Sequence, residues 1–301
     1  MIKKTSLIKK INHLLVGCCA FLIHSNTLAE GSPWGSALSG HVLQGQYAQN
    51  TSKETTTTVG LDWQVGYLDR YEVTFIGNRT STHFYDETIL LDKSLDQTSI
   101  QIDIAKHYFS DFFKGRLTPN VWLMNANGTL SDPVLGDVIA YGGGLNYLSY
   151  TQKYAGDFHF ARSDYEQDIQ ATQIDAALGF SLAANWLQMR YYQISETYQD
   201  QSYQAIDFLF KHFFGDNAWL DIDSIFVGSV IGDRLYAYDT DSHSLWNVNE
   251  KQTMYNRIGV EWHLSNRWDL LMLYGQSEHQ NLSTDLAYKL NFAYLNISKA
   301  W

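Results

Sequence analysis

The side chains that could carry out catalysis lie in one long polar segment near the C-terminal end of the sequence. His243 and Ser244 could supply the base and the nucleophile of a hydrolase, because a serine hydroxyl needs a neighbouring base to react. Asp233, Asp239 and Asp241 could offer oxygen ligands to calcium, although their spacing is irregular. The motifs G-x-S-x-G and H-E-x-x-H do not occur. We interpret the segment as a polar loop and expect no enzyme, no cofactor and no metal site.

Three consecutive glycines, Gly142, Gly143 and Gly144, could suggest a phosphate-binding loop. A glycine-rich phosphate loop is followed by a helix whose first N–H groups bind the phosphate. No helical pattern follows Gly144, so we do not expect a phosphate site there. The glycines are more typical of a strand that bends or that has a neighbouring side chain lying close against it.

The charged residues could form a second kind of site, because they alternate with apolar residues along extended segments. Such alternation places them on one face of a sheet. Acids outnumber bases in this set, and a ring of carboxylates favours cations in a pore. Alternatively, the charges pair across neighbouring strands, Lys211 with Asp207 for instance, inside a filled interior. The set comprises Asp62, Glu72, Asp103, Asp157, Asp175, Asp207, Asp221, Asp223, Glu261 and Asp269, with His159, Arg190, Lys211, Arg257 and Lys289.

The segment from Val59 to Phe75 shows the alternation most clearly and predicts a hairpin of two strands. Its turn is Leu68–Arg70. We expect the acids Asp62 and Glu72 on the polar face. The expected apolar face consists of Val59, Leu61, Trp63, Val65, Tyr71, Val73 and Phe75.

The same pattern recurs along the chain and predicts about fourteen strands in an up-and-down antiparallel sheet. Tight turns alternate with longer connections, of which the longest are residues 78–95, 126–137 and 231–251. The predicted strands are residues 41–49, the two arms of 59–75, 99–108, 117–125, 138–147, 154–161, 172–182, 186–194, 204–213, 219–227, 255–264, 268–275 and 286–301.

Aromatic residues gather at the tight turns, where they would mark a membrane boundary. Tyr and Trp are enriched at that level in membrane proteins. The arms have about the 9 to 11 residues that a tilted strand needs to cross a bilayer. A soluble secreted β-protein is the alternative. The predicted girdle, on the periplasmic side, is Tyr67, Tyr71, Phe109, Tyr150, Tyr154, Trp186, Phe213, Trp219, Trp262 and Trp268.

The first 29 residues have the organisation of a secretory signal peptide. Four lysines precede an apolar run at 14–23, and a small residue, Ala29, precedes the expected cleavage site. A lipoprotein signal that ends at Cys18 is the alternative. Both cysteines lie in this segment, so the mature chain would hold no disulfide. We expect residues 30–38 to be a short periplasmic leader and 39–301 to form one β-barrel domain.

The net charge of the chain is −11. This sign argues against nucleic acid, and against anionic lipid headgroups, as the main partner. A low share of proline and many aromatic residues are typical of strand-rich proteins.

Residues 39–301 resemble the Gram-negative outer-membrane β-barrel proteins. The aromatic last residue, Trp301, is similar to the C-terminal signal by which the outer-membrane assembly machinery recognises such barrels, although Ser298, Lys299 and Ala300 break the alternation before it. Fourteen strands without a plug resemble monomeric porins of the OmpG type. The fatty-acid transporters of equal strand number have an N-terminal hatch domain, for which residues 30–38 are too few.

The resemblance implies a porin or channel in the cell outer membrane that passes small hydrophilic solutes. The excess of acids on the predicted inner face favours cationic or neutral ones. It also implies contact with outer-membrane lipid and lipopolysaccharide. A non-conducting envelope barrel that serves export, anchoring or adhesion with partner proteins is the alternative. A lipid-modifying enzyme that uses Ser244 is a weaker one.

Overall fold

The computed structural model describes residues 33–48, 53–86, 91–128, 137–165, 169–197, 200–215, 222–235, 238–239, 244–245, 250–265, 267–282 and 285–301. The expected signal peptide, residues 1–29, lies outside this part of the chain. Among the described residues, no helix is long and apolar enough to cross a membrane.

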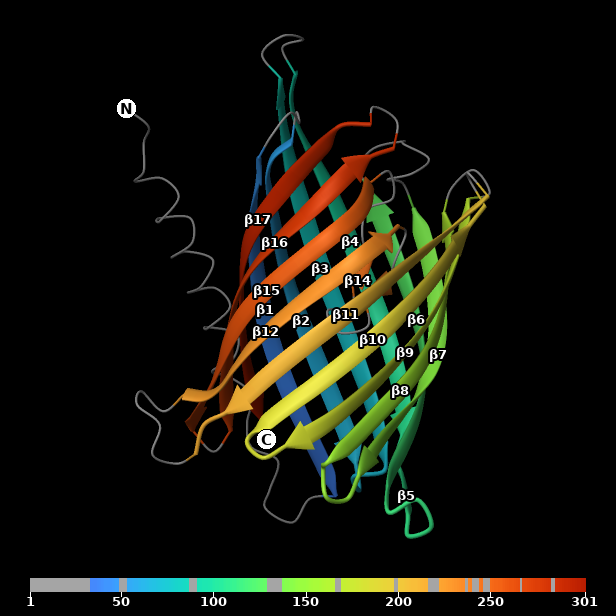
Figure 1. Ribbon diagram of the computed structural model, residues 1–301, viewed down its shortest axis with the longest axis vertical. Helices are drawn as coiled ribbons and strands as arrows, with labels where there is room; N and C mark the ends of the chain where they lie inside the picture. The colour runs from blue at the N-terminus through green and yellow to red at the C-terminus, as the bar shows by residue number, and fades with distance from the viewer. Residues whose placement is uncertain are drawn as a thin grey trace.

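The described chain is built from β-strands that follow one another in space in nearly the order of the sequence (Figure 1). The strands are β1 Trp34–Ala48, β2 Lys53–Tyr67, β3 Tyr71–Asp86, β4 Leu91–Lys106, β5 Tyr108–Ser110, β6 Gly115–Gly128, β7 Val138–Ser149, β8 Tyr154–Tyr165, β9 Gln170–Leu182, β10 Asn185–Glu196, β11 Gln201–Phe213, β12 Ile222–Arg234, β13 Tyr238–Asp239, β14 Ser244–Leu245, β15 Glu250–Ser265, β16 Trp268–Asn281 and β17 Ala287–Ala300.

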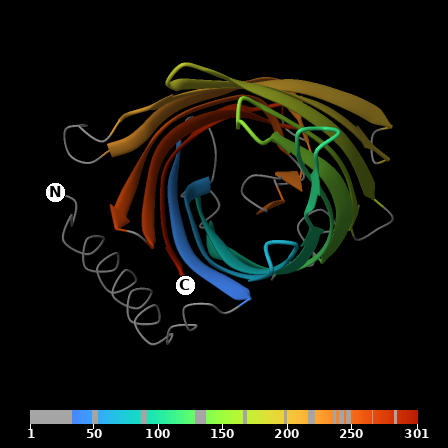
Figure 2. The same ribbon diagram turned by 90° about the horizontal axis from the view of Figure 1, so that it is seen from below.

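The sheet closes into a barrel because β1 pairs antiparallel with both β2 and β17. The barrel has 14 strands, and the short β5 extends the sheet beyond β4 at the end with the tight turns. Figure 2 shows the closed ring along its axis, with the small hairpin β13–β14 inside its outline. Closure leaves no unpaired edge, which is what a sheet surrounded by lipid requires. The predicted fold class is confirmed.

The strands are longer at the loop end than the sequence pattern predicts. Residues 78–95 are not a long loop, because β3 continues to Asp86 and β4 begins at Leu91. At the turn end, β1 begins at Trp34, so the second half of the expected leader belongs to the first strand. The loop-end extensions of β3 and β4 are rich in Thr, Ser and charged residues on both faces. An alternation of apolar and polar residues therefore cannot reveal them.

The two faces of the first hairpin are as predicted. Leu61, Trp63 and Phe75 are exposed on the outer face, whereas Asp62 and Glu72 are partly buried on the inner face. Equivalent outer positions in the turn-end halves of other strands form a continuous apolar belt. It includes Ile102, Val121, Leu123, Phe158, Phe160, Leu178, Phe208, Phe210, Val227, Ile258 and Met272.

Polar residues replace the apolar ones at outer positions further towards the loop end. The strands of this barrel have 12 to 16 residues, more than a tilted strand needs to cross the bilayer. The barrel therefore extends beyond its apolar belt at the loop end. The polar outer positions include Thr57, Arg79, Arg162, Gln193, Gln204, Asn256, Gln276 and Asn291.

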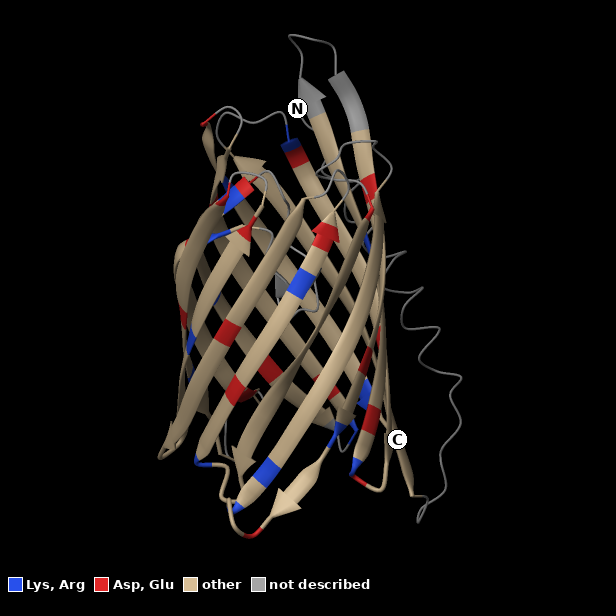
Figure 3. Cartoon of the chain, turned by 90° about the vertical axis from the view of Figure 1, so that its right-hand side faces the viewer, with Lys and Arg blue, Asp and Glu red and all other residues tan. Residues whose placement is uncertain are grey.

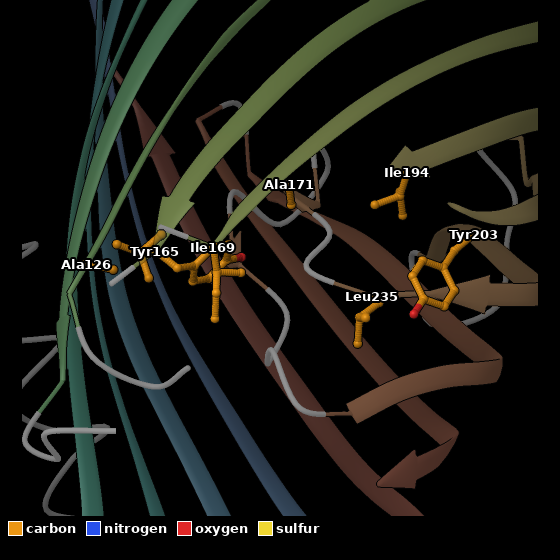
Figure 4. Packing of buried hydrophobic residues seen from close by; sticks show 8 residues of the cluster. Ala126, Tyr165, Ile169, Ala171, Ile194, Tyr203 and Leu235 are labelled. Atoms are coloured by element: carbon orange, nitrogen blue, oxygen red, sulfur yellow. The ribbon is translucent and has the colours of Figure 1, made fainter. Parts of the chain in front are cut away.

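The inner wall holds buried apolar clusters as well as charges. Near the loop end, Leu235, which follows β12, belongs to a cluster of buried apolar side chains that extends from β6 to β11, and it lies beside Tyr203 (Figure 4). The members of this cluster are Ala126, Val138, Tyr165, Ile169, Ala171, Ile194, Tyr203 and Leu235. A second cluster runs along the wall from β10 to β17 and contains Tyr192, Ala205, Val230, Tyr255, Leu290 and Phe292.

Inward-facing glycines let large side chains of neighbouring strands lie along the wall. A Cβ atom at Gly142 would come within 2.6 Å of the Trp122 ring, and one at Gly144 within 1.8 Å of the His159 ring. Phe292 lies in the same way over Gly275, and Phe226 over Gly259. The glycine run of β7 is thus a place where side chains of β6 and β8 approach closely, one of the two interpretations that the sequence allowed.

Candidate functional site: the inner wall of the barrel

Arg190 is the centre of a buried group of charges on β8, β9 and β10. Its guanidinium lies 2.7 Å from the Asp175 carboxylate and 3.1 Å from that of Asp157. The Nδ1 atom of His159 lies 3.3 Å from Asp175 and 3.4 Å from Asp157. The antiparallel register places His159 directly opposite Asp175, and the missing Cβ of Gly144 leaves space for the imidazole. Four of the predicted lining residues therefore form one hydrogen-bonded group.

A second group of charges continues the first along β11, β12 and β15. Arg190 of β10 pairs in register with Asp207 of β11, whose carboxylate lies 2.8 Å from the Arg257 guanidinium. Lys211 forms an ion pair with Glu261, and the Ser224 hydroxyl donates a 2.7 Å hydrogen bond to the same carboxylate. Both ion pairs cross over β12. The two groups together form a strip of alternating charge on one side of the wall.

The acids on the other side of the wall have neutral or histidine partners. Ser39 donates a 3.1 Å hydrogen bond to Asp62, and Asn120 donates a 2.9 Å bond to Asp103. The Nε2 atom of His107 lies 3.5 Å from the Glu72 carboxylate. This side, formed by β1 to β6, therefore differs from the strip on β8 to β15.

The remaining predicted lining residues lie near the turn end or have partners other than those expected. Asp269 lies at the turn-end rim, where His263 contacts it at 2.5 Å. Lys211 pairs with Glu261 and not with Asp207, the partner suggested by sequence proximity. Asp223 is exposed near the start of β12, next to the inward-facing Ser224. Asp221 lies outside the described residues.

The assignment of Lys289 to the lining is wrong. In β17, Tyr288, Leu290 and Phe292 are buried on the inner wall, so Lys289 lies on the outer face. There it forms a 2.6 Å ion pair with Glu278 of β16. The sequence suggested the reverse because an apolar residue was taken to face lipid, whereas the inner wall is itself apolar at this height.

The predicted aromatic girdle is only partly on the outer face. Tyr67, Tyr71, Tyr154, Trp262 and Trp268 occupy outer positions at the turn ends of their strands. Tyr150 is exposed in the turn after β7, and Phe109 is exposed in β5. These aromatic residues therefore lie around the turn end of the barrel.

Two girdle assignments are wrong, and one falls outside the described residues. Trp186 lies on the inner wall. It is four residues before the inward-facing Arg190 in β10, so both side chains lie on the same face of the strand, and its indole covers Gly179. Phe213 shares the inner face of β11 with Lys211, whose Nζ lies 5.0 Å from the centre of its ring. Trp219 is not among the described residues. An aromatic next to a turn can lie on either face, so proximity to a turn does not determine its side.

A buried charged group at the loop end was not predicted. Lys53 of β2 reaches Glu250 of β15, and both side chains are almost fully buried. The ammonium lies 5.4 Å from the ring of Tyr47 and 5.5 Å from that of Tyr288. The ring of Tyr288 also stacks on His279 at 5.3 Å. No sequence signal brings residues 53 and 250 together, because three strands lie between them in the sheet.

Three ligand-type side chains, those of Asp157, His159 and Asp175, lie within 4.8 Å of one another. The Arg190 guanidinium already supplies a positive charge at this position. We therefore interpret the group as an ion-pair cluster of the wall and not as a metal centre.

The loop residues that suggested catalysis or calcium binding are only partly described. Ser244 and Asp239 pair in the short hairpin β13–β14. Asp233 forms a 3.1 Å ion pair with Lys251, which gives its carboxylate a partner within the chain. His243 and Asp241 lie outside the described residues.

The comparisons with known proteins show similarity in fold only. No family model and no curated protein matches the sequence. A mutant of the monoaromatic hydrocarbon channel TodX superposes with a TM-score of 0.60 and 9% identity, over 89% of this chain and 90% of that one. The toluene transporter TodX of Pseudomonas putida gives a TM-score of 0.54 at 10% identity, over 90% and 92% of the two chains. The monoaromatic hydrocarbon channel CymD gives 0.53 at 8% identity, over 90% and 89%. The chain thus has the fold of these outer-membrane channel barrels.

Proposed function

We propose that the chain is an outer-membrane channel for small solutes. The observation that carries the proposal is a closed barrel with an apolar belt outside and a charged, hydrogen-bonded strip along its inner wall. An apolar outer face suits lipid, and a polar inner face suits water and solutes. The proteins of similar fold include a monoaromatic hydrocarbon channel and a toluene transporter, which supports the proposal.

The solutes that we propose are small and hydrophilic, with little preference set by the charged strip on β8 to β15. The sequence suggested cations because acids outnumber bases, but the acids of this strip have basic partners. Asp157 and Asp175 share Arg190, Asp207 has Arg257, and Glu261 has Lys211. A carboxylate paired with a guanidinium or an ammonium presents little net field to a passing ion, so this strip gives little basis for cation selectivity. Asp62 and Asp103 keep their charge beside neutral partners on the opposite side of the wall.

Liposome swelling tests permeation directly. Purified protein in vesicles should admit a pentose faster than a disaccharide, and vesicles without protein should admit neither. Toluene uptake should be measured in parallel. One of the structurally similar proteins is a monoaromatic hydrocarbon channel, and the inner wall of this barrel also has an apolar cluster. Vesicles that exclude every one of these solutes would contradict a channel.

A non-conducting envelope barrel is the second candidate, in an export, anchoring or adhesion role with partner proteins. The observation that favours it is the packing of the inner wall, where aromatic residues such as Tyr192, Tyr165 and Phe292 are buried. Co-purification of one stable envelope partner, with no solute entry in the swelling assay, would support this candidate over the channel.

Both candidates place the chain in the cell outer membrane after export and cleavage of residues 1–29. We propose recognition by the outer-membrane assembly machinery through the C-terminal strand and Trp301, with phospholipid and lipopolysaccharide as lipid partners. We propose no cofactor, no nucleic acid and no catalysis.

A further inference from the structure

Basic residues surround the turn end of the barrel on its outer side. Arg70, Lys114, Lys153 and Arg267 lie in the tight turns and are exposed. Lys106 ends β4, and Lys299 lies one residue before the end of β17. Figure 3 shows blue positions along this lower end of the barrel. We call the six residues the basic collar.

Two members of the collar lie against aromatic rings at the level of the girdle. The Nζ atom of Lys106 lies 5.3 Å from the ring centre of Tyr71 and 4.6 Å from that of Tyr108. The Nζ atom of Lys299 lies 5.1 Å from the ring centres of both Trp268 and Trp301. Aromatic faces attract cations. They hold these two ammonium groups at the membrane boundary without neutralising them.

Within the described part of the chain, none of the six collar residues forms an ion pair. The basic residues on the outer face towards the loop end, by contrast, form ion pairs. Arg79 pairs with Asp96 at 3.2 Å, Arg162 with Asp164 at 3.1 Å, and Lys251 with Asp233 at 3.1 Å. Lys289 pairs with Glu278 in the same way. The positive charge of the outer surface is therefore neutralised at one end and not at the other.

We propose that the basic collar binds the phosphate headgroups of anionic phospholipids in the leaflet that surrounds the turns. Cations at an aromatic girdle lie at the depth of lipid headgroups, where anionic lipids attract them. The acids Asp69, Asp111, Asp223 and Asp269 are exposed at the same end and reduce the effect, but among the described residues none of them forms an ion pair with a collar residue. The net charge of −11 does not reveal this site, because it sums the charges of the whole chain without regard to their position.

Quenching of tryptophan fluorescence by brominated lipids measures the preference, because Trp268 and Trp301 flank Lys299. The protein is reconstituted in mixed vesicles whose brominated component is either phosphatidylglycerol or phosphatidylcholine. We expect phosphatidylglycerol to be preferred several-fold at low salt, with the preference falling as salt is added. Equal binding of the two lipids by the unaltered protein would overturn the proposal.

The variant Arg70→Gln/Lys106→Gln/Arg267→Gln/Lys299→Gln should lose most of the preference. The matched control, Arg79→Gln/Arg162→Gln/Lys251→Gln/Lys289→Gln, removes the same number of bases from the paired loop end and should keep the preference. Retention of the preference in the collar variant, or its loss in the control alone, would contradict the proposal. A heat-dependent shift on a detergent gel checks that each variant forms the barrel. The fluorescence readout does not depend on solute passage, so failure of the lipid-binding proposal and failure of the channel proposal can be distinguished.

Discussion

At the scale of single residues, the inner wall depends on close packing between glycines and large side chains. Gly144 lies beneath His159, and the imidazole in this position contacts Asp157 and Asp175. The absence of one Cβ atom is therefore linked to the geometry of the Arg190 cluster. Glycine in a strand interior otherwise weakens it, which makes the close approach the physical reason for its presence.

The substitution Gly144→Ala should destabilise the barrel. Its Cβ would lie 1.8 Å from the His159 ring, and overpacking of this kind costs about 1 to 3 kcal/mol. Urea unfolding in lipid vesicles, followed by tryptophan fluorescence, measures the change. Gly77→Ala is the matched control, because nothing lies within 4 Å of its Cβ position. If His159→Ala in the same chain does not relieve the cost, the imidazole is not what the new methyl group meets.

The substitution Arg190→Met should cost more than removal of an exposed base. It leaves Asp157 and Asp175 without their guanidinium, and breaking a buried ion pair typically costs about 3 to 5 kcal/mol. Arg162→Met breaks the exposed pair with Asp164, for which about 0 to 1 kcal/mol is expected. The same unfolding assay compares the two variants. Equal costs would mean that the Arg190 cluster is solvated and not buried.

At the scale of strands, alternation predicts faces only where the two faces differ in polarity. The β2–β3 hairpin has apolar residues outside and acids inside, so its faces are predicted correctly. In β17 the apolar residues Leu290 and Phe292 face inward and pack with Tyr255, and Lys289 faces outward. A pattern of apolar and polar residues cannot distinguish lipid from an apolar interior. The contact between Lys53 and Glu250 was also beyond prediction, because it depends on closure of the barrel.

The faces of β3 can be tested with two adjacent substitutions. Val73→Arg places a charge on the outer belt and should cost about 2 to 4 kcal/mol if the position lies near the middle of the bilayer. Thr74→Arg places the same charge on the inner wall, where Thr74 pairs in register with Asp103, and should cost much less. The ratio of folded to unfolded protein in vesicles at graded urea gives both values. Equal tolerance of the two arginines would show that the faces, or the membrane, are assigned wrongly.

At the scale of the whole molecule, the pairing of charged residues differs between the two ends of the barrel. Acids and bases pair along the inner wall and on the outer face of the loop end, whereas the collar at the turn end is unpaired. The apolar belt covers only the turn-end halves of the strands. A bilayer placed on that belt leaves the loop end, with the Leu235 cluster and the Lys53–Glu250 pair, on the other side of the membrane. This arrangement agrees with the orientation that we propose, in which the phospholipid leaflet surrounds the turns.

Single-channel recording in a planar bilayer tests the central claim most directly. The barrel should give discrete conductance steps in potassium chloride, with at most a weak cation preference in a salt gradient, because Arg190, Arg257 and Lys211 neutralise most of the acids on β8 to β15. Asp175→Asn should move the reversal potential towards anion preference, since it removes one acid beside Arg190. Bilayers that stay sealed in repeated preparations of heat-shifting, folded protein would contradict the channel and favour the non-conducting barrel.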